Sequence, residues 1–190
     1  MDEARRMVDK YSDELSRMSS RPSLLAGPGL VALEIEPIGD IEAYGQRLRQ
    51  VLMAAANVAH EQGFDREVLD SSGIPRWFAF ITDSGESSEV DIPAESLRGR
   101  ERYYEDRSEG EWDLQEWLFC FDPDLRRWLW WDLTTPDGRK AVLWIDTKGE
   151  PVIPCEELWW AVFAAGARSA RGPVLTPAEE WQQQSSIGIR

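Results

Sequence analysis

Tryptophan and carboxylate side chains gather in one part of this sequence, and they are the residue types best suited to recognising a partner. Seven of the ten tryptophans lie at positions 112, 117, 128, 130, 131, 144 and 159. Tryptophan is enriched among the residues that dominate protein–protein binding energy, and carboxylates steer basic partners toward a surface. Together they predict a partner-binding surface formed by Glu111, Trp112, Asp113, Glu116, Trp128, Trp130, Trp131 and Asp132.

The same tryptophans also have a structural interpretation. Because Cβ atoms alternate along a strand, Trp130 and Asp132 would share one sheet face and Trp131 would lie on the other. A sheet that is apolar on both faces must be covered on both faces. The predicted helices over residues 40–63 and 155–166 would then cover one face, and the long loop together with the N-terminal helix would cover the other. In that arrangement the tryptophans belong to the core, and the nearby carboxylates are solvated turn residues.

The sequence contains few residues that are suited to catalysis or to binding a metal ion or a phosphate group. Paired carboxylates beside tryptophan are the ingredients of a carbohydrate-cleaving or carbohydrate-binding cleft, but spacing alone does not support such a cleft in a chain where carboxylates occur throughout. His60, the only histidine, lies near the end of a predicted helix, where it complements the helix dipole. Cys120 and Cys155 lack the spacing of a zinc site, and the turn at residues 27–29 lacks the lysine of a phosphate-binding loop. We therefore expect no catalytic residue, no metal and no cofactor.

The charge of the chain limits its partners. The 190 residues include 21 Lys and Arg against 35 Asp and Glu, which gives a formal net charge of −14. This length and an ordinary composition predict a single domain over residues 1–190. The negative charge opposes binding to nucleic acid or to an anionic membrane and favours a basic protein. Because the sequence shows neither a signal peptide nor a membrane-spanning stretch, we expect a cytoplasmic protein with reduced thiols.

The first part of the chain has a helical pattern. Apolar residues at helical spacing predict an amphipathic helix over residues 2–18 and a longer main helix over residues 40–63. Asp40 is placed as the N-cap of the main helix and Gly63 as its C′ residue. A short apolar run at residues 30–35 predicts a strand between the two helices.

From residue 77 the apolar period changes to two. This pattern predicts an antiparallel sheet over residues 77–153, with strands at 77–81, 112–121, 128–133, 140–146 and 151–153. The other predicted segments are a long polar loop over residues 84–110, a buried apolar helix over 155–166 and a tail over 172–190 that contains a short helix at 177–184. The elements together predict an α+β fold, an antiparallel meander of about five to six strands packed with N-terminal helices and a C-terminal apolar helix.

Three segments carry a resemblance to known proteins: residues 117–122 (WLFCFD), 141–146 (AVLWID) and 156–160 (EELWW). In their layout within residues 40–166, the chain resembles the small acidic immunity proteins of bacterial polymorphic toxin systems, among them the SUKH-type α+β proteins. The resemblance implies a cytoplasmic, non-enzymatic protein that docks on a basic toxin, commonly one that acts on nucleic acid. It rests on layout and carries over no residue-level motif, so it assigns no site residue.

Two other functions fit the same composition. One is a small-molecule or carbohydrate-binding protein, including a hydrolase that uses paired carboxylates. The other is a chaperone or adaptor that binds an extended segment of a secreted protein. Spare apolar surface would also allow the chain to form a homodimer.

Overall fold

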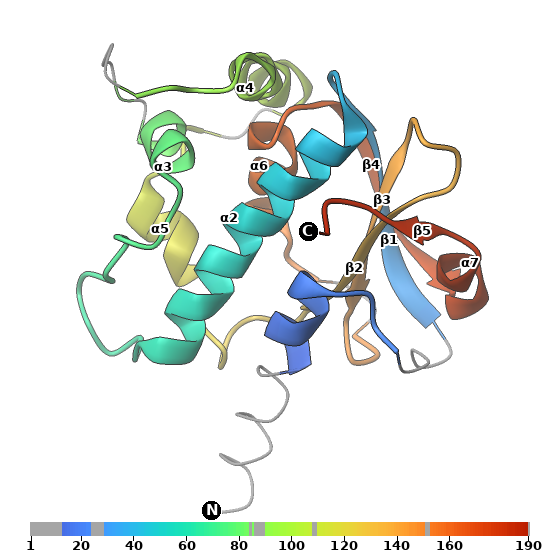
Figure 1. The fold of residues 1–190 in the computed structure, drawn as a ribbon. Helices are drawn as coiled ribbons and strands as arrows, with labels where there is room; N and C mark the ends of the chain where they lie inside the picture. The colour runs from blue at the N-terminus through green and yellow to red at the C-terminus, as the bar shows by residue number, and fades with distance from the viewer. Residues whose placement is uncertain are drawn as a thin grey trace, which may run out of the picture.

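The computed structural model describes residues 13–23, 29–83, 85, 90–107, 110–150 and 153–189. Within these residues the chain forms an α+β fold in which helices pack against a five-stranded antiparallel sheet (Figure 1). The predicted fold class is therefore confirmed. Residues 13–19 form a helix, whereas residues 2–12 of the predicted N-terminal helix and residues 151–152 of the last predicted strand lie outside the described residues.

The strands are arranged differently from a meander. The labelled elements in chain order are β1 Gly29–Pro37, α2 Ile41–Glu61, α3 Arg76–Thr82, α4 Ala94–Asp106, α5 Leu114–Phe119, β2 Leu129–Thr135, β3 Ala141–Asp146, α6 Glu156–Ala164, β4 Ala167–Pro177, α7 Ala178–Gln182 and β5 Ser185–Ser186. In the sheet the order is β4-β1-β3-β2-β5, and each neighbouring pair is antiparallel. Among these strands, only β2 and β3 are neighbours both in the sheet and along the chain. The predicted consecutive meander is thus limited to that hairpin.

The apolar residues of β1 explain its place inside the sheet. Leu30 and Ala32 belong to a buried cluster on one face, and Leu33 and Ile35 belong to the main core on the other. A strand that is buried on both faces is suited to the interior of a sheet. Residues 171–175 of β4 are exposed, and this strand forms an edge.

One segment predicted as a strand contains α5 instead. Within residues 112–121, the Asp113 carboxylate caps this helix by accepting from the backbone N–H groups of Gln115 and Glu116 at 2.8 and 3.1 Å. Apolar periodicity alone cannot separate a short buried helix from a short buried strand. The cap satisfies the first N–H groups of the helix, and the prediction of a strand here is wrong.

Two further segments that the sequence does not predict as helices also contain helices. Residues 77–81, predicted as a strand, lie in α3, and the predicted loop over residues 84–110 contains α4. Each of these helices follows a proline, whose fixed φ suits the beginning of a helix. In α4 the mixed charges lie on a helix surface, where Arg102 Nη1 and Glu105 Oε2 pair at 2.6 Å, three residues apart.

The two helices with the strongest sequence signals are confirmed. Asp40 caps α2 by accepting from the N–H of Ala43 at 2.7 Å. The helix ends at Glu61 and its C-cap residue Gln62 is extended, so Gly63 does not supply the predicted left-handed C′ residue. In α6, eight of the nine residues are buried, as the apolar sequence predicts.

The predicted tail is a structured part of the fold. It contributes part of β4, the predicted short helix, which is α7, and β5, which pairs with β2. The C-terminal segment also packs closely on α2, because a Cβ atom on Gly45 would lie 2.9 Å from the backbone nitrogen of Gly188. The N–H of Gly188 donates to the Glu42 carboxylate at 2.8 Å. The segment that ends at residue 189 is therefore anchored to the main helix.

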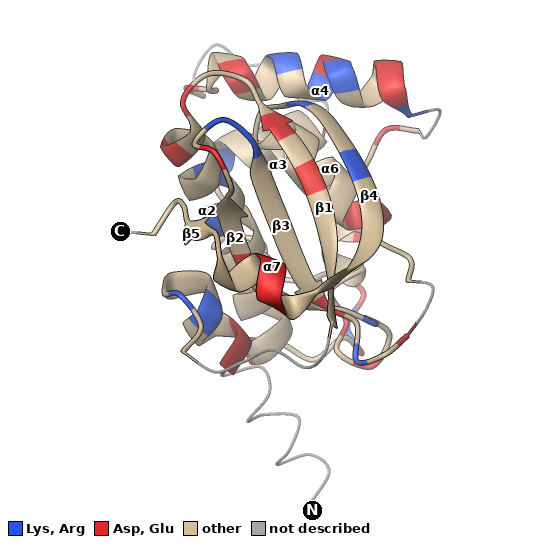
Figure 2. Ribbon diagram, turned by 90° about the vertical axis from the view of Figure 1, so that its right-hand side faces the viewer, with Lys and Arg blue, Asp and Glu red and all other residues tan. Residues whose placement is uncertain are grey.

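The sheet has buried side chains on both faces. The main core includes residues of the sheet, α2 and α6. A smaller cluster on the opposite face consists of Leu30, Ala32, Trp131, Val142, Trp144 and Trp181. Trp181 belongs to α7, which lies across one end of this face (Figure 2). Strand β1 also carries Glu34 and Glu36, which are exposed.

We expect Gly99→Ala to lower the free energy of unfolding, because α4 approaches α6 too closely for a methyl group. A Cβ atom on Gly99 would overlap the carbonyl oxygen of Phe163. The expected loss is about 1–3 kcal/mol, measured by urea unfolding followed by tryptophan fluorescence. The control is Gly73→Ala, where nothing lies within 4 Å of the added atom, and it should change stability by less than about 1 kcal/mol. Equal stability of the two variants would contradict the close approach.

Candidate functional site

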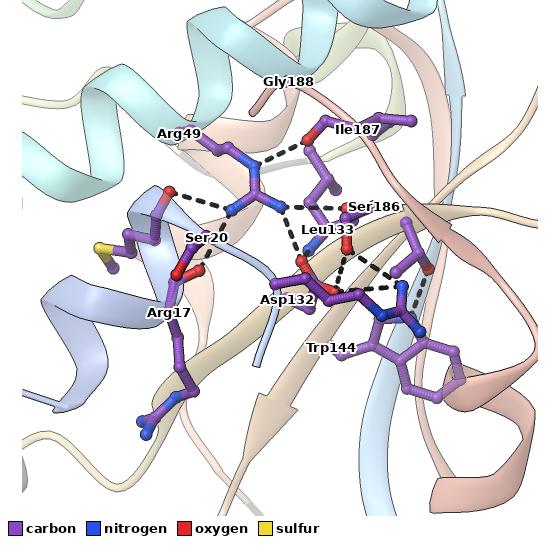
Figure 3. Close-up of polar contacts among 12 residues, drawn as sticks. Arg17, Ser20, Arg49, Asp132, Leu133, Trp144, Ser186, Ile187 and Gly188 are labelled. Atoms are coloured by element: carbon purple, nitrogen blue, oxygen red, sulfur yellow. Dashed lines mark hydrogen bonds and ion pairs between the residues drawn. The ribbon is translucent and has the colours of Figure 1, made fainter. Parts of the chain in front are cut away.

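Asp132, a predicted binding residue, lies in the interior at a bulge in β2 (Figure 3). Its Oδ1 accepts a hydrogen bond from Arg49 Nη2 at 2.7 Å. Its Oδ2 accepts from Trp181 Nε1 at 2.9 Å and from Ser186 Oγ at 2.6 Å. None of its side-chain surface is exposed, so this carboxylate is committed to contacts within the chain.

Arg49 joins the N-terminal helical segment, α2, β2 and the C-terminal segment. Besides Asp132, its guanidinium donates to the carbonyl oxygens of Ile187 at 2.7 Å, Met18 at 3.0 Å and Leu133 at 3.2 Å. Burial lowers the pKa of Arg49, and the neighbouring Asp132 carboxylate opposes this shift. The pair thus satisfies two buried charges and connects distant parts of the sequence.

A second buried network holds the beginning of β2. Trp128 Nε1 donates to Glu157 Oε1 at 2.6 Å. Glu14 accepts from Arg126 Nη2 and from the backbone N–H of Trp130, both at 2.6 Å. Burial raises the pKa of Glu157, and the hydrogen bond from Trp128 opposes that shift. These polar groups are structural, because their partners are other groups of the interior.

Half of the predicted binding residues are consequently core residues. Trp128, Trp130 and Asp132 have no exposed surface. Trp131 keeps 8% of its surface exposed and packs edge-to-face on Trp181, with ring centres 5.6 Å apart. Such residues do not reach a partner while the fold is intact, which corrects this half of the predicted surface. These side chains are buried because helices cover one face of β2 and α7 covers Trp131 on the other face.

The other predicted binding residues lie at the surface near the beginning of α5. Glu111, Asp113 and Glu116 are exposed, and Trp112 is half-buried. Trp112 Nε1 donates to the hydroxyl group of Tyr103 in α4 at 3.0 Å. This bond holds the segment that precedes α5 against α4, so residues of both helices contribute to one surface.

Tyr104 of α4 belongs to the same surface, although the sequence does not single it out. It is 37% exposed, and both burial and the nearby Glu111 carboxylate raise its pKa. The mixed charges of residues 84–110 predict a loop, whereas the three-residue spacing of Arg102 and Glu105 is the signal that indicates a helix there. We define the acidic helix surface as Tyr104, Glu111, Trp112, Asp113 and Glu116.

Within the described residues, no ion pair engages the carboxylates of the acidic helix surface. Among the described residues, the ion pairs of the chain involve other acids, and none joins Glu111, Asp113 or Glu116 to a Lys, Arg or His. Exposed carboxylates without a cation keep their negative potential toward solvent. The surface therefore combines unpaired negative charge with two partly exposed aromatic rings.

The remaining candidates for chemistry are unreactive or isolated. Burial, assisted by Glu157, raises the pKa of Cys120 to about 11 and that of Cys155 to about 12. Thiols with such pKa values stay protonated at neutral pH and are poor nucleophiles. Both cysteines are free, and His60 is exposed in the last turn of α2. In the described part of the chain, no three His, Cys, Asp or Glu side chains are grouped as for a metal ion, and no helix has the length and apolarity that crossing a membrane requires.

Known proteins do not define the site further. No protein-family model, curated protein or solved structure matches this chain. The resemblance to SUKH-type immunity proteins therefore stays a prediction from layout.

Removing the Asp132 carboxylate should destabilise the whole fold, because Arg49 would stay buried without its counter-charge. For Asp132→Ala we expect a loss of about 3–5 kcal/mol in the free energy of unfolding, measured in guanidinium chloride. The matched control is Glu105→Ala, which breaks an exposed ion pair with Arg102 and should cost less than about 1 kcal/mol. Losses of similar size in the two variants would show that the buried pair lacks the role assigned to it.

Glu157 should make the protein less stable as pH rises. Its pKa in the folded chain lies above the ordinary value of 4.5, so the folded state binds this proton more strongly than the unfolded state. The resulting stabilisation is complete below pH 4.5 and is lost as pH rises through the folded pKa. Glu157→Gln keeps an acceptor for Trp128 and removes the titration. We expect its stability relative to wild type to increase from about pH 4 to pH 8 in urea titrations, and a pH-independent difference would contradict the raised pKa.

Proposed function

We propose that this protein is a non-enzymatic binding protein that docks a basic partner protein through the acidic helix surface. One observation carries the proposal: Glu111, Asp113 and Glu116 are exposed beside two partly exposed aromatic rings, and within the described residues none of the three has an ion-pair partner. Asp113 caps α5 through its Oδ1, and the Glu111 and Glu116 carboxylates, which have no ion-pair partner among the described residues, are available to a partner. Aromatic rings beside them supply the contact area that binding hot spots use.

The charge of the whole chain supports a basic partner. At a net charge of −14, the field of the protein attracts a basic protein and raises the association rate most at low salt. Arginine side chains of such a partner would pair with the carboxylates of the acidic helix surface. They would also stack on Tyr104 or Trp112, because a guanidinium group binds to the face of an aromatic ring.

Within this function, we propose the role of an immunity or inhibitor-like protein that binds a toxin. Proteins that act on nucleic acid carry clustered Lys and Arg residues, which neutralise phosphate groups. A surface of exposed carboxylates would compete for the same cations and would block access of nucleic acid. The layout that resembles bacterial immunity proteins supports this choice of partner.

A carbohydrate site on the sheet has less support. Such a site needs accessible aromatic rings beside free carboxylates. Trp128 and Trp130 are fully buried, and the Asp132 carboxylate is engaged by Arg49, Trp181 and Ser186. We therefore favour protein binding over a sugar-binding or sugar-cleaving function.

Reversing charge on the acidic helix surface should abolish partner binding. We expect the tagged wild-type protein to retain one basic protein from its own cells at low salt, and to lose it as salt rises, because exposed charges are screened. The double variant Glu111→Lys with Glu116→Lys should not retain it. The measurement is affinity pull-down followed by mass spectrometry.

The matched control is Glu34→Lys with Glu36→Lys, which makes the same change of charge on exposed residues of β1. It should retain the basic protein as the wild type does. Equal retention by all three proteins, or by none, would contradict the proposed surface. If the retained protein is a toxin, co-expression with wild type should restore growth, and co-expression with the Glu111→Lys, Glu116→Lys variant should not.

A further inference from the structure

A groove runs along α2. This helix is the long one at the centre of Figure 1. The groove consists of two hollows, with volumes of about 520 and about 290 Å³. Gln50 and Met53 line both hollows, so the two adjoin each other along α2. We call the two adjoining hollows the α2 groove. None of the residues of the acidic helix surface lines it.

Segments from other parts of the chain form the walls of the α2 groove. Near the beginning of the helix, Met18 and Gly188 line it, and Gly188 is packed against Gly45. Near the end of the helix, Asp70 lines it, and its backbone forms two hydrogen bonds with the side chain of Gln62, at 2.8 and 2.9 Å. Because internal contacts fix these walls, the groove is formed before any ligand binds. Preformed sites avoid the cost of ordering on binding.

The length of the groove suits a linear peptide. Its lining extends along α2 from Ala43 to Glu61. At a rise of about 1.5 Å per residue, this part of the helix is roughly 27 Å long. An extended chain covers about 3.3 Å per residue, so about eight residues would fill the groove.

The side chains of the groove suit an extended backbone. Gln46, Gln50 and Asn57 line it, and Gln50 and Asn57 are exposed. Each amide side chain carries donors and an acceptor, which can pair with the N–H and C=O groups of a bound strand. Met53 lies on α2 between Gln50 and Asn57, is partly buried, and can adapt its shape to different apolar side chains.

The charges of the groove differ between its two ends. Arg47 lines the end near the beginning of α2, and its Nε donates to the carbonyl oxygen of Ala165 at 2.8 Å. Glu61 and Asp70 line the opposite end. Arg49 also borders the groove, but its charge is balanced by the buried Asp132 carboxylate. A ligand that matches this pattern has opposite charges at its two ends.

We infer that the α2 groove binds an extended peptide segment of a partner protein, about eight residues long, with an acidic side chain near Arg47 and a basic side chain near Glu61 and Asp70. This is a second binding site, and it goes beyond the proposed function. The groove supplies hydrogen bonds to the peptide backbone through its amides. Specificity comes from the charges at the two ends.

The test measures the binding of three fluorescein-labelled octapeptide pools by fluorescence anisotropy. One pool has glutamate first and arginine last, one has the two reversed, and one has serine at both ends. The inner positions are equimolar mixtures of Ala, Val, Thr and Ser. We expect one charged pool to bind the wild-type protein at least about tenfold more tightly than the serine pool. Equal binding of all three pools, or binding of none at about 1 mM, would overturn the inference.

Two variants of α2 test whether the binding occurs in the groove. Gln50→Trp fills the part that both hollows share and should weaken binding by at least about tenfold. The matched control His60→Trp changes an exposed residue of the same helix that does not line the groove, and it should bind as wild type does. Equal affinities of these two variants would overturn the inference. Circular dichroism and unfolding midpoints check that both variants are folded.

Two further variants separate this inference from the proposed function. Arg47→Gln should reduce the preference for the charged pool over the serine pool, because only the charges of Glu61 and Asp70 remain to select it. The double variant Glu111→Lys with Glu116→Lys should bind the charged pool as wild type does, because these residues lie outside the groove. Loss of peptide binding in that double variant would place the peptide on the acidic helix surface and would overturn the inference that the α2 groove binds it.

Discussion

The buried ion pair between Arg49 and Asp132 is the interaction on which the arrangement of the chain depends. Arg49 binds carbonyl groups of Met18 and Ile187, and Asp132 binds the side chains of Trp181 and Ser186, so segments from near both ends of the chain meet at one point. Either charge left alone in this interior would be strongly destabilising. A buried pair adds little net stability over an apolar replacement, because desolvation offsets its attraction. We interpret this pair as the contact that specifies which segments come together.

The burial of these aromatic and acidic side chains limits which surfaces can bind a partner. Trp128 and Trp130 are fully buried, and the carboxylates nearest to them are held by internal hydrogen bonds. The central part of the sheet is therefore core, and both proposed sites lie on helices. Exposed acids that form no ion pair within the described residues occur where α4 meets the beginning of α5, while α2 presents a groove lined by amides. The two proposed sites thus differ in chemistry as well as in position.

Sequence reasoning succeeds here where a local signal agrees with the final packing. The cap at Asp40 and the regular apolar spacing predict α2, and the apolar run of residues 155–166 predicts α6. It fails for α3 and α5, because short apolar runs fit a helix and a strand equally well and long-range packing decides between them. The prediction that Trp130 and Asp132 share one face of the sheet is wrong, because a bulge in β2 lies between them. Trp130 is opposite Ile145 of the main core, and Asp132 is opposite Trp144 on the other face. Of the candidate site, the exposed acids were predictable from composition, whereas the contribution of α4 depended on tertiary packing.

Hydrogen–deuterium exchange of the complex formed with the basic protein that is retained at low salt tests the proposed function most directly. Backbone amides exchange more slowly where a partner covers them. We expect slower exchange at residues 104–107 and 110–116 in the complex than in the free protein, with unchanged exchange in the exposed part of β4. Protection confined to other faces, with none around the beginning of α5, would contradict the claim that the acidic helix surface is the docking site.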